Sequence, residues 1–162
     1  MTVKKLGLGG GCHWCTEAVF ASFVGIGNVQ QGWINSLFPN DTFSEAVIVD
    51  YNEEMTSLKD LIHIHLLTHS ATSNHSMRNK YRSAIYYFTE KDRLEIESIL
   101  KELQVGFDQP IITLLLPFKD FRPSLPEHLN YYYSNPEKPF CQLYINPKLQ
   151  MLREKFKHLP IK

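Results

Sequence analysis

Residues 9–17 read Gly-Gly-Gly-Cys-His-Trp-Cys-Thr-Glu, and this stretch decides how the chain begins to fold. An apolar run over residues 3–8 precedes it, and residues 14–24 follow with apolar side chains at helical spacing. We therefore predict a strand, a tight glycine turn and a helix. The turn places Cys12 at the start of the helix, where backbone N–H groups and the positive end of the helix dipole stabilise an anion. Cys12 is the candidate nucleophile.

A second cysteine, Cys15, lies three residues after Cys12. At this spacing a second sulfur can stabilise a thiolate by hydrogen bonding or form a disulfide with it. Haem attachment needs Cys-x-x-Cys-His, whereas His13 lies inside this pair, and a lone Cys-x-x-Cys lacks the second half of a structural zinc site. Both cysteines could be apolar packing groups, but three consecutive glycines contribute nothing to a core. The pattern indicates redox chemistry.

The composition is ordinary for a globular protein and fits one domain over residues 1–162, with 43% hydrophobic and 21% charged residues. Seventeen basic and seventeen acidic residues cancel, so the field that binds nucleic acid or an anionic membrane is missing. No apolar run approaches the ~20 residues that span a bilayer, and no signal-type segment follows the N-terminus. The odd number of cysteines argues against a disulfide framework. We expect a cytoplasmic protein without nucleic-acid or membrane partners.

Hydrophobic periodicity and turn residues predict the remaining elements. We expect strands over 28–34, 45–51, 83–88 and 111–116, and helices over 57–68, 90–104 and around 149–156. Ser57 or Thr56 is placed to cap the first of these helices, and proline-rich coil should precede the last. The resulting order, β-α-β-β-α-β-α-β, is not a regular βαβ alternation. We predict an α+β two-layer domain, a mixed sheet with helices and a ferredoxin-like core.

Four segments, in order along the chain, resemble the class A methionine sulfoxide reductase family. The glycine-rich lead into Cys12-x-Trp14-x-x-Glu17 resembles that family's G-C-F-W-x-x-E signature. The other three are Ser44–Val47, similar to H-A-E-A-V; Tyr81–Ile85, similar to Q-Y-R-S-A-I; and Phe140–Gln142 with Ile145–Leu149, similar to Y-C-x-x-x-I-x-P-K-L. Agreement in order and approximate spacing over most of the chain indicates homology more strongly than one pattern does.

The resemblance implies reduction of methionine-S-sulfoxide, in proteins or as the free amino acid. Cys12 would attack the sulfoxide sulfur and become a sulfenic acid, Glu45 would supply a proton to the oxygen, and Tyr81 would hydrogen-bond that oxygen. Trp14 would form the apolar wall for the S-methyl group. Cys141 would resolve the sulfenic acid to a disulfide, which an external thiol reductant such as thioredoxin would reduce. No bound cofactor and no metal are expected.

Four positions depart from the family pattern, all around the expected substrate pocket. His13 stands where the family has Phe, which replaces an apolar wall with a titratable polar group. Trp33 occupies what resembles the family's Gly-Tyr position, so an indole N–H replaces a hydroxyl. Ser76 stands where the family has Asp, in a shortened loop. Cys15 replaces a Gly and offers a second resolving thiol, so the choice between Cys15 and Cys141 stays open.

Two other functions are compatible with these residues. A catalytically altered homologue could use Cys12, Cys15 and His13, with His69 or His75, to bind a transition metal or to sense thiol redox state. Adjacent residues such as Cys12 and His13 rarely point at one ion, however. A general thiol-disulfide oxidoreductase based on the Cys-x-x-Cys pair ranks last. The sequence favours a divergent methionine-S-sulfoxide reductase.

Overall fold

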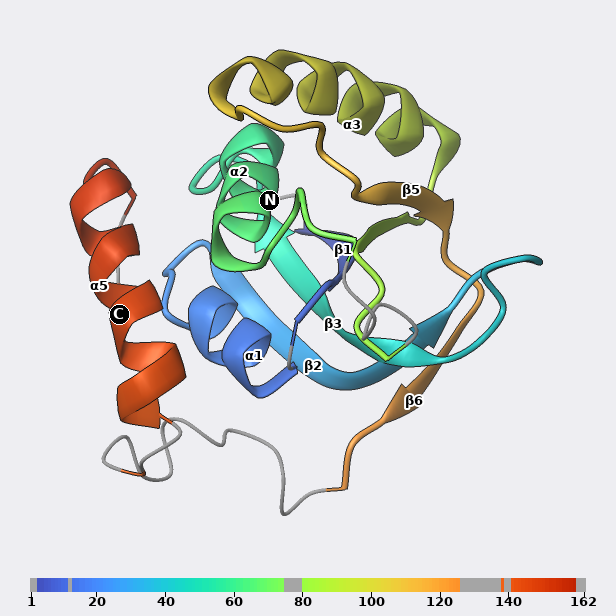
Figure 1. Ribbon diagram of the computed structural model, residues 1–162, viewed down its shortest axis with the longest axis horizontal. Coiled ribbons are helices and arrows are strands. Elements are labelled where there is room, and N and C mark those ends of the chain that lie inside the picture. The colour runs from blue at the N-terminus through green and yellow to red at the C-terminus, as the bar shows by residue number, and fades with distance from the viewer. Residues whose placement is uncertain (1–2, 12, 75–79, 126–137, 139–140, 160–162) are drawn as a thin grey trace.

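A curled, mixed six-stranded sheet forms the centre of the fold (Figure 1). The computed structural model describes residues 3–11, 13–74, 80–125, 138 and 141–159, without the side chains of His13, Cys141 and Tyr144. The strands are β1 (Val3–Gly9), β2 (Ile26–Asn35), β3 (Ser44–Asn52), β4 (Ala84–Tyr87), β5 (Leu114–Pro117) and β6 (Asp120–Pro123). They lie in the order β5-β4-β1-β3-β2-β6, and β5 runs parallel to β4 while every other pair is antiparallel.

The helices are α1 (His13–Ala21), α2 (Leu58–Thr68), α3 (Glu90–Leu103) and α5 (Asn146–Lys155). A 3₁₀ turn, η2 (Gln104–Gly106), continues α3, and a π-helical turn, η4 (Cys141–Ile145), leads into α5. Hydroxyl side chains begin two of the helices, because Ser57 accepts from the N–H of Asp60 and Thr89 from that of Asp92. None of the described helices has the length and apolar character needed to cross a bilayer.

The first six elements, β1-α1-β2-β3-α2-β4, form the ferredoxin-like core that the sequence predicts. Their strands lie in the order β4-β1-β3-β2, so each of the helices α1 and α2 connects two strands that are separated by a third. β5 and β6 extend this four-stranded core by one strand at each edge. The fold is therefore the expected α+β arrangement of helices on a mixed sheet.

The two faces of the sheet carry apolar clusters of different size. Alternate residues of β3, namely Val47, Val49 and Tyr51, join Leu6 and Leu8 of β1 in the main core beneath the helices. Figure 1 shows α1 and α2 over this face, with α3 and α5 at its margins. The intervening residues of β2, β3 and β4 form a smaller cluster on the opposite face: Ile34, Ala46, Ile48, Ala84 and Tyr86.

The ends of several elements differ from the sequence prediction, and two of these differences have a clear structural cause. The first helix ends at Ala21 rather than residue 24, because Ser22 turns back and its hydroxyl donates to the carbonyl of Val19. The strand expected over 111–116 begins only at Leu114, since the N–H groups of Ile111 and Ile112 donate to Gln104 and Ala71 instead of a neighbouring strand. The coil expected after it contains the additional edge strand β6.

Close approach of two backbones at the β2–β6 pair requires Gly32. A Cβ at this position would overlap the carbonyl oxygen of Arg122. We expect Gly32→Ala to lower the free energy of unfolding by about 1–3 kcal/mol, because the edge strand must move away from β2. Gly106→Ala is the matched control, since a Cβ there meets no atom within 4 Å. Urea unfolding of both variants measures the difference, and equal stabilities would contradict this account of β6.

Burial of His63 between α2 and α5 predicts a pH dependence of stability. Its ring meets that of Phe156 edge-on at 5.3 Å. Burial lowers the pKa of His63 from its ordinary value of 6.5, Lys155 and Lys59 lower it further, and Asp60 opposes them. The folded chain therefore binds this proton less readily than the unfolded chain, so stability is lost as the pH falls below about 6.5.

The measurement compares urea unfolding of the wild type and of His63→Gln above and below that pH. We expect the wild type to lose more stability on acidification than the variant, which lacks the titrating ring. His158, which lies near Phe156 and pairs with Asp60 at 3.0 Å, is present in both proteins and cancels in the comparison. An equal or larger loss in His63→Gln would contradict the assignment.

Candidate active site

The glycine-rich stretch is closely packed against neighbouring segments where it leaves the sheet. A Cβ at Gly9 would lie 3.1 Å from the carbonyl oxygens of both Glu45 and Arg82. Gly10 has a φ of +144° and leaves no room for a side chain, because the ring of His69 fills the space, with its Nε2 atom 2.7 Å from the Cβ position. The end of β1 is thus fixed against the strand start that carries Glu45. Helix α1 begins at His13 after this turn.

A set of three hydrogen bonds, here called the Ser44 clamp, joins the start of β3 to residues 80–82. The hydroxyl of Ser44 donates to the carbonyl of Lys80 at 2.9 Å and accepts from the N–H of Arg82 at 2.7 Å. The N–H of Glu45 donates to the same carbonyl at 3.1 Å. Ser44 is buried, so these bonds are shielded from water. The clamp places Tyr81 beside Glu45 although 36 residues separate them in the sequence.

The buried side chain of Arg82 fixes the same segment from the other side. Its guanidinium donates to the carbonyl and hydroxyl oxygens of Thr42, at 2.7 and 2.6 Å, and to the hydroxyl of Tyr86 at 3.1 Å. A planar guanidinium holds several acceptors in one rigid geometry. Burial raises the pKa of Tyr86, and the nearby charge of Arg82 opposes that rise. The chain before β3 and the chain before β4 therefore form one rigid unit.

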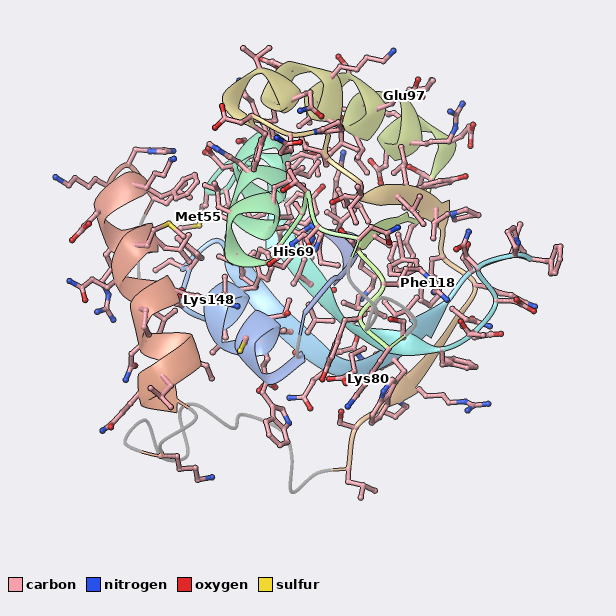
Figure 2. The ribbon with its side chains drawn as sticks, in the orientation of Figure 1. Met55, His69, Lys80, Glu97, Phe118 and Lys148 are labelled. Atoms are coloured by element: carbon pink, nitrogen blue, oxygen red, sulfur yellow. The ribbon has the colours of Figure 1, made fainter. Side chains whose placement is uncertain are left out.

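Glu45 is the buried carboxyl of this site, with only 5% of the residue exposed. It lies directly opposite Trp33 in the β2–β3 register, so both side chains face the layer of helices. The ammonium of Lys80 is 3.6 Å from a Glu45 oxygen and 5.2 Å from the ring centroid of Tyr81. A hydrogen bond to Tyr81 raises the pKa of Lys80 most, and the charge of Glu45 adds to the rise. Figure 2 labels Lys80 at this edge of the sheet.

The structure thus brings together Glu45, Trp33 and Tyr81, as the resemblance implies, and adds Lys80. The sequence analysis gave Lys80 no role, although it directly precedes Tyr81 in the sequence. The Ser44 clamp was missed as well, because only the tertiary fold brings Ser44 and Arg82 together. Trp14 lies half-buried in the first turn of α1, next to the end of the glycine stretch.

The structure describes the three cysteines to different extents. Cys15 is 5% exposed and belongs to the main core, together with Ala18 and Val19 on the inner face of α1. Cys141 begins η4, which packs against α1, but its side chain is not described. Cys12 lies outside the described residues.

The structure also leaves untested two further predictions about which residues line the substrate pocket. Ser76 lies outside the described residues, and the side chain of His13 is not described. Within the part of the chain that the structure describes, no three His, Cys, Asp or Glu side chains gather as a metal site would require.

A cavity of about 510 Å³ lies between α1, the edge strand β6 and the part of β2 that precedes Trp33. Its lining includes the buried Glu17 and Gln31 and the ring of Phe121. Neither Glu45 nor Tyr81 lines it. The two residues that the resemblance assigns to the sulfoxide oxygen therefore do not form its wall.

Comparison with known proteins agrees with the fold and with the family resemblance of the sequence. A family model described as "Peptide methionine sulfoxide reductase" matches residues 4–159. The chain is 34% identical over 165 residues to the peptide methionine sulfoxide reductase MsrA of Acinetobacter baumannii (strain AYE), covering 93% of this chain and 95% of that protein.

Solved structures show the same fold. Reduced Mxr1 from Saccharomyces cerevisiae has a TM-score of 0.74 at 24% identity, over 86% of this chain and 89% of that one. Mxr1 in complex with Trx2 has a TM-score of 0.60 at 24% identity, over 80% and 84% of the two chains. The chain therefore belongs to the peptide methionine sulfoxide reductase family and is an oxidoreductase of that type.

Proposed function

We propose that this chain reduces methionine-S-sulfoxide, peptide-bound or free, with Cys12 as nucleophile and external thiols as the source of electrons. The observation that carries the proposal is the buried carboxyl of Glu45, held beside Trp33, Tyr81 and Lys80 where the glycine stretch leaves the sheet. Membership of the family supports the reaction class. The single domain and the cytoplasmic location expected from the sequence remain predictions.

The chemistry needs only a thiolate and a proton donor. The Cys12 thiolate forms a bond to the sulfoxide sulfur as the oxygen is protonated. The resulting hydroxyl group then transfers to the cysteine sulfur, and both the original sulfur–oxygen bond and the transient sulfur–sulfur bond break. The products are a thioether and a cysteine sulfenic acid, so the substrate sulfur is reduced by two electrons and the cysteine sulfur is oxidised by two. No prosthetic group is needed for this exchange.

Glu45 is the proposed proton donor to the sulfoxide oxygen. It is buried, and the ammonium of Lys80 lies 3.6 Å from one of its oxygens. Lys80 is largely solvent-exposed, which weakens its electrostatic effect. Tyr81, fixed by the Ser44 clamp, is the proposed second hydrogen-bond donor to the same oxygen.

Trp14, half-buried in the first turn of α1, is the proposed apolar wall for the S-methyl group. Trp33, which lies opposite Glu45 in the sheet register, is proposed to offer its indole N–H to the sulfoxide oxygen. His13 and Ser76 are proposed to adjust which substrates enter. The replacement of an apolar family residue by His13 favours a pocket that accepts a more polar molecule than the family pattern implies.

Cys141 is the proposed resolving thiol. It would displace water from the sulfenic acid and form a disulfide with Cys12, which a dithiol reductant then cleaves. The packing of η4 against α1 supports this choice, because it holds the Cys141 segment near the helix that follows Cys12. Cys15 is less suited, since attack by its sulfur would require it to leave the main core. A thioredoxin-type reductant is supported by the Mxr1 complex with Trx2.

The function is tested by turnover of the S and R epimers of a methionine sulfoxide peptide, with dithiothreitol as reductant so that no resolving thiol is needed. We expect the wild type to reduce the S epimer only, and Cys12→Ser to be inactive because the serine hydroxyl is a poor nucleophile at neutral pH. Cys15→Ser is the matched control and should retain turnover. Activity in Cys12→Ser, or no activity in the folded wild type, would contradict the proposal.

Replacing dithiothreitol with a thioredoxin system tests the resolving thiol. Cys141→Ser should lose most steady-state turnover and accumulate a sulfenic acid at Cys12, which dimedone labels, whereas Cys15→Ser should not. The opposite pattern would assign the resolving step to Cys15.

A further inference from the structure

Two histidines at the C-terminal end of α2, His65 in its last turn and His69 as its C-cap, form a polar network that takes no part in the proposed reaction steps. The rings of His65 and His69 stack with 4.2 Å between centroids and 33° between planes. His65 is 2% exposed. Figure 2 labels His69 near the middle of the molecule. Helix periodicity alone would treat these residues as ordinary members of a packed face.

His65 terminates the ladder of β1. Its Nε2 atom is 2.7 Å from the carbonyl oxygen of Gly9, and because a carbonyl only accepts, Nε2 carries the proton. Gly9 is the last residue of β1 and is buried, so its carbonyl needs a donor where strand pairing ends. The imidazole supplies that donor and fixes the point at which the strand becomes the glycine turn.

His69 supports the next residue of the turn. Its Nδ1 atom donates to the carbonyl of His65 at 2.5 Å, so Nε2 of the neutral ring accepts from the hydroxyl of Ser83 at 2.8 Å. The Ser83 hydroxyl is also 2.8 Å from the hydroxyl of Thr113, which gives it a second hydrogen-bond partner that does not belong to α2. A ring held in this way cannot swing aside, and it fills the space beside Gly10 where a Cβ would stand.

From this geometry we infer that His65 and His69 are positioning residues for the glycine turn and, through it, for Cys12, which follows the turn in the sequence. Together they fix two consecutive residues, Gly9 through its carbonyl and Gly10 through contact with a locked ring. The direction in which the following N–H groups point depends on these two residues, and those groups determine how well a thiolate is stabilised. The inference rests on the proposed function only in taking Cys12 as the nucleophile.

The test measures the rate at which iodoacetamide alkylates Cys12, identified by mass spectrometry of its peptide, over the range of about pH 5–9 in which thiols titrate. We expect His65→Leu to slow alkylation at neutral pH and to move the midpoint of the profile to higher pH. With dithiothreitol, its kcat for the sulfoxide should fall about ten- to a hundredfold, with a smaller change in KM. His65→Gln keeps an N–H donor and should recover most of both effects.

His63→Leu is the matched control, because His63 lies on the same helix but faces Phe156. It should leave the alkylation profile and kcat unchanged. If His65→Leu lowers only the thermal midpoint and leaves the Cys12 profile unchanged, the pair has a structural role alone and the inference fails. If the wild type does not reduce the sulfoxide, the proposed function is refuted separately, since the alkylation profile of Cys12 is measured without sulfoxide turnover.

Thr113→Val provides a milder variant if His65→Leu does not fold. It removes only the hydroxyl that holds Ser83, so the ring of His69 should loosen while the helix stays intact. We expect a shift of the Cys12 profile in the same direction as for His65→Leu, and smaller. An unchanged profile in a folded Thr113→Val protein would overturn the assignment of His69.

Discussion

The three hydrogen bonds of the Ser44 clamp are the constraint on which the rest of the site depends. One buried hydroxyl accepts from the N–H of Arg82 and donates to the carbonyl of Lys80, so two segments 36 residues apart meet at a single side chain. Without it, Glu45 would begin an ordinary strand and Tyr81 would lie in an ordinary loop. With it, a carboxyl, a phenol and an ammonium share one edge of the sheet. Arg82 stiffens this arrangement by binding Thr42 and Tyr86.

The sheet register accounts for the remaining geometry. Because β2 and β3 are antiparallel and Trp33 lies opposite Glu45, the indole and the carboxyl project to the same face. β1 ends beside this pair, where Gly9 fits between the carbonyls of Glu45 and Arg82. The turn that follows needs glycine for two separate reasons, close approach at Gly9 and a positive φ at Gly10. The site is therefore assembled from the ends of strands. The helices cover it, and the end of α2 carries the two histidines, His65 and His69, that contact the glycine turn.

Much of the fold could be predicted from the sequence, because it depends on local patterns. The periodicity of β1, β3, α2 and α3 and the hydroxyl cap at Ser57 are visible in the residues themselves. The edge strand β6 is not, since it is four residues long, ends in proline and gains its identity only by pairing with β2. The late start of β5 likewise reflects hydrogen bonds from Ile111 and Ile112 to distant parts of the chain.

The site was predictable to a different degree. Family resemblance selected Glu45, Tyr81 and Trp33, and the structure places these three together. The contacts of Lys80, Ser44, His65 and His69 could not be predicted, because only the tertiary fold creates them. Burial in the core makes Cys15 the less suited of the two candidate resolving thiols in our proposal, which spacing alone could not indicate.

The most direct test of the central claim is kcat/KM for the S epimer in Glu45→Gln, measured with dithiothreitol beside Glu54→Gln as an exposed control. Glutamine fills the same volume but cannot deliver the proton, so the account predicts a loss of about 10²–10⁴-fold in Glu45→Gln, with folding and Cys12 alkylation intact. Glu54→Gln should match the wild type. A Glu45→Gln protein within a few-fold of wild-type activity would show that Glu45, which the Ser44 clamp positions, is not the catalytic acid.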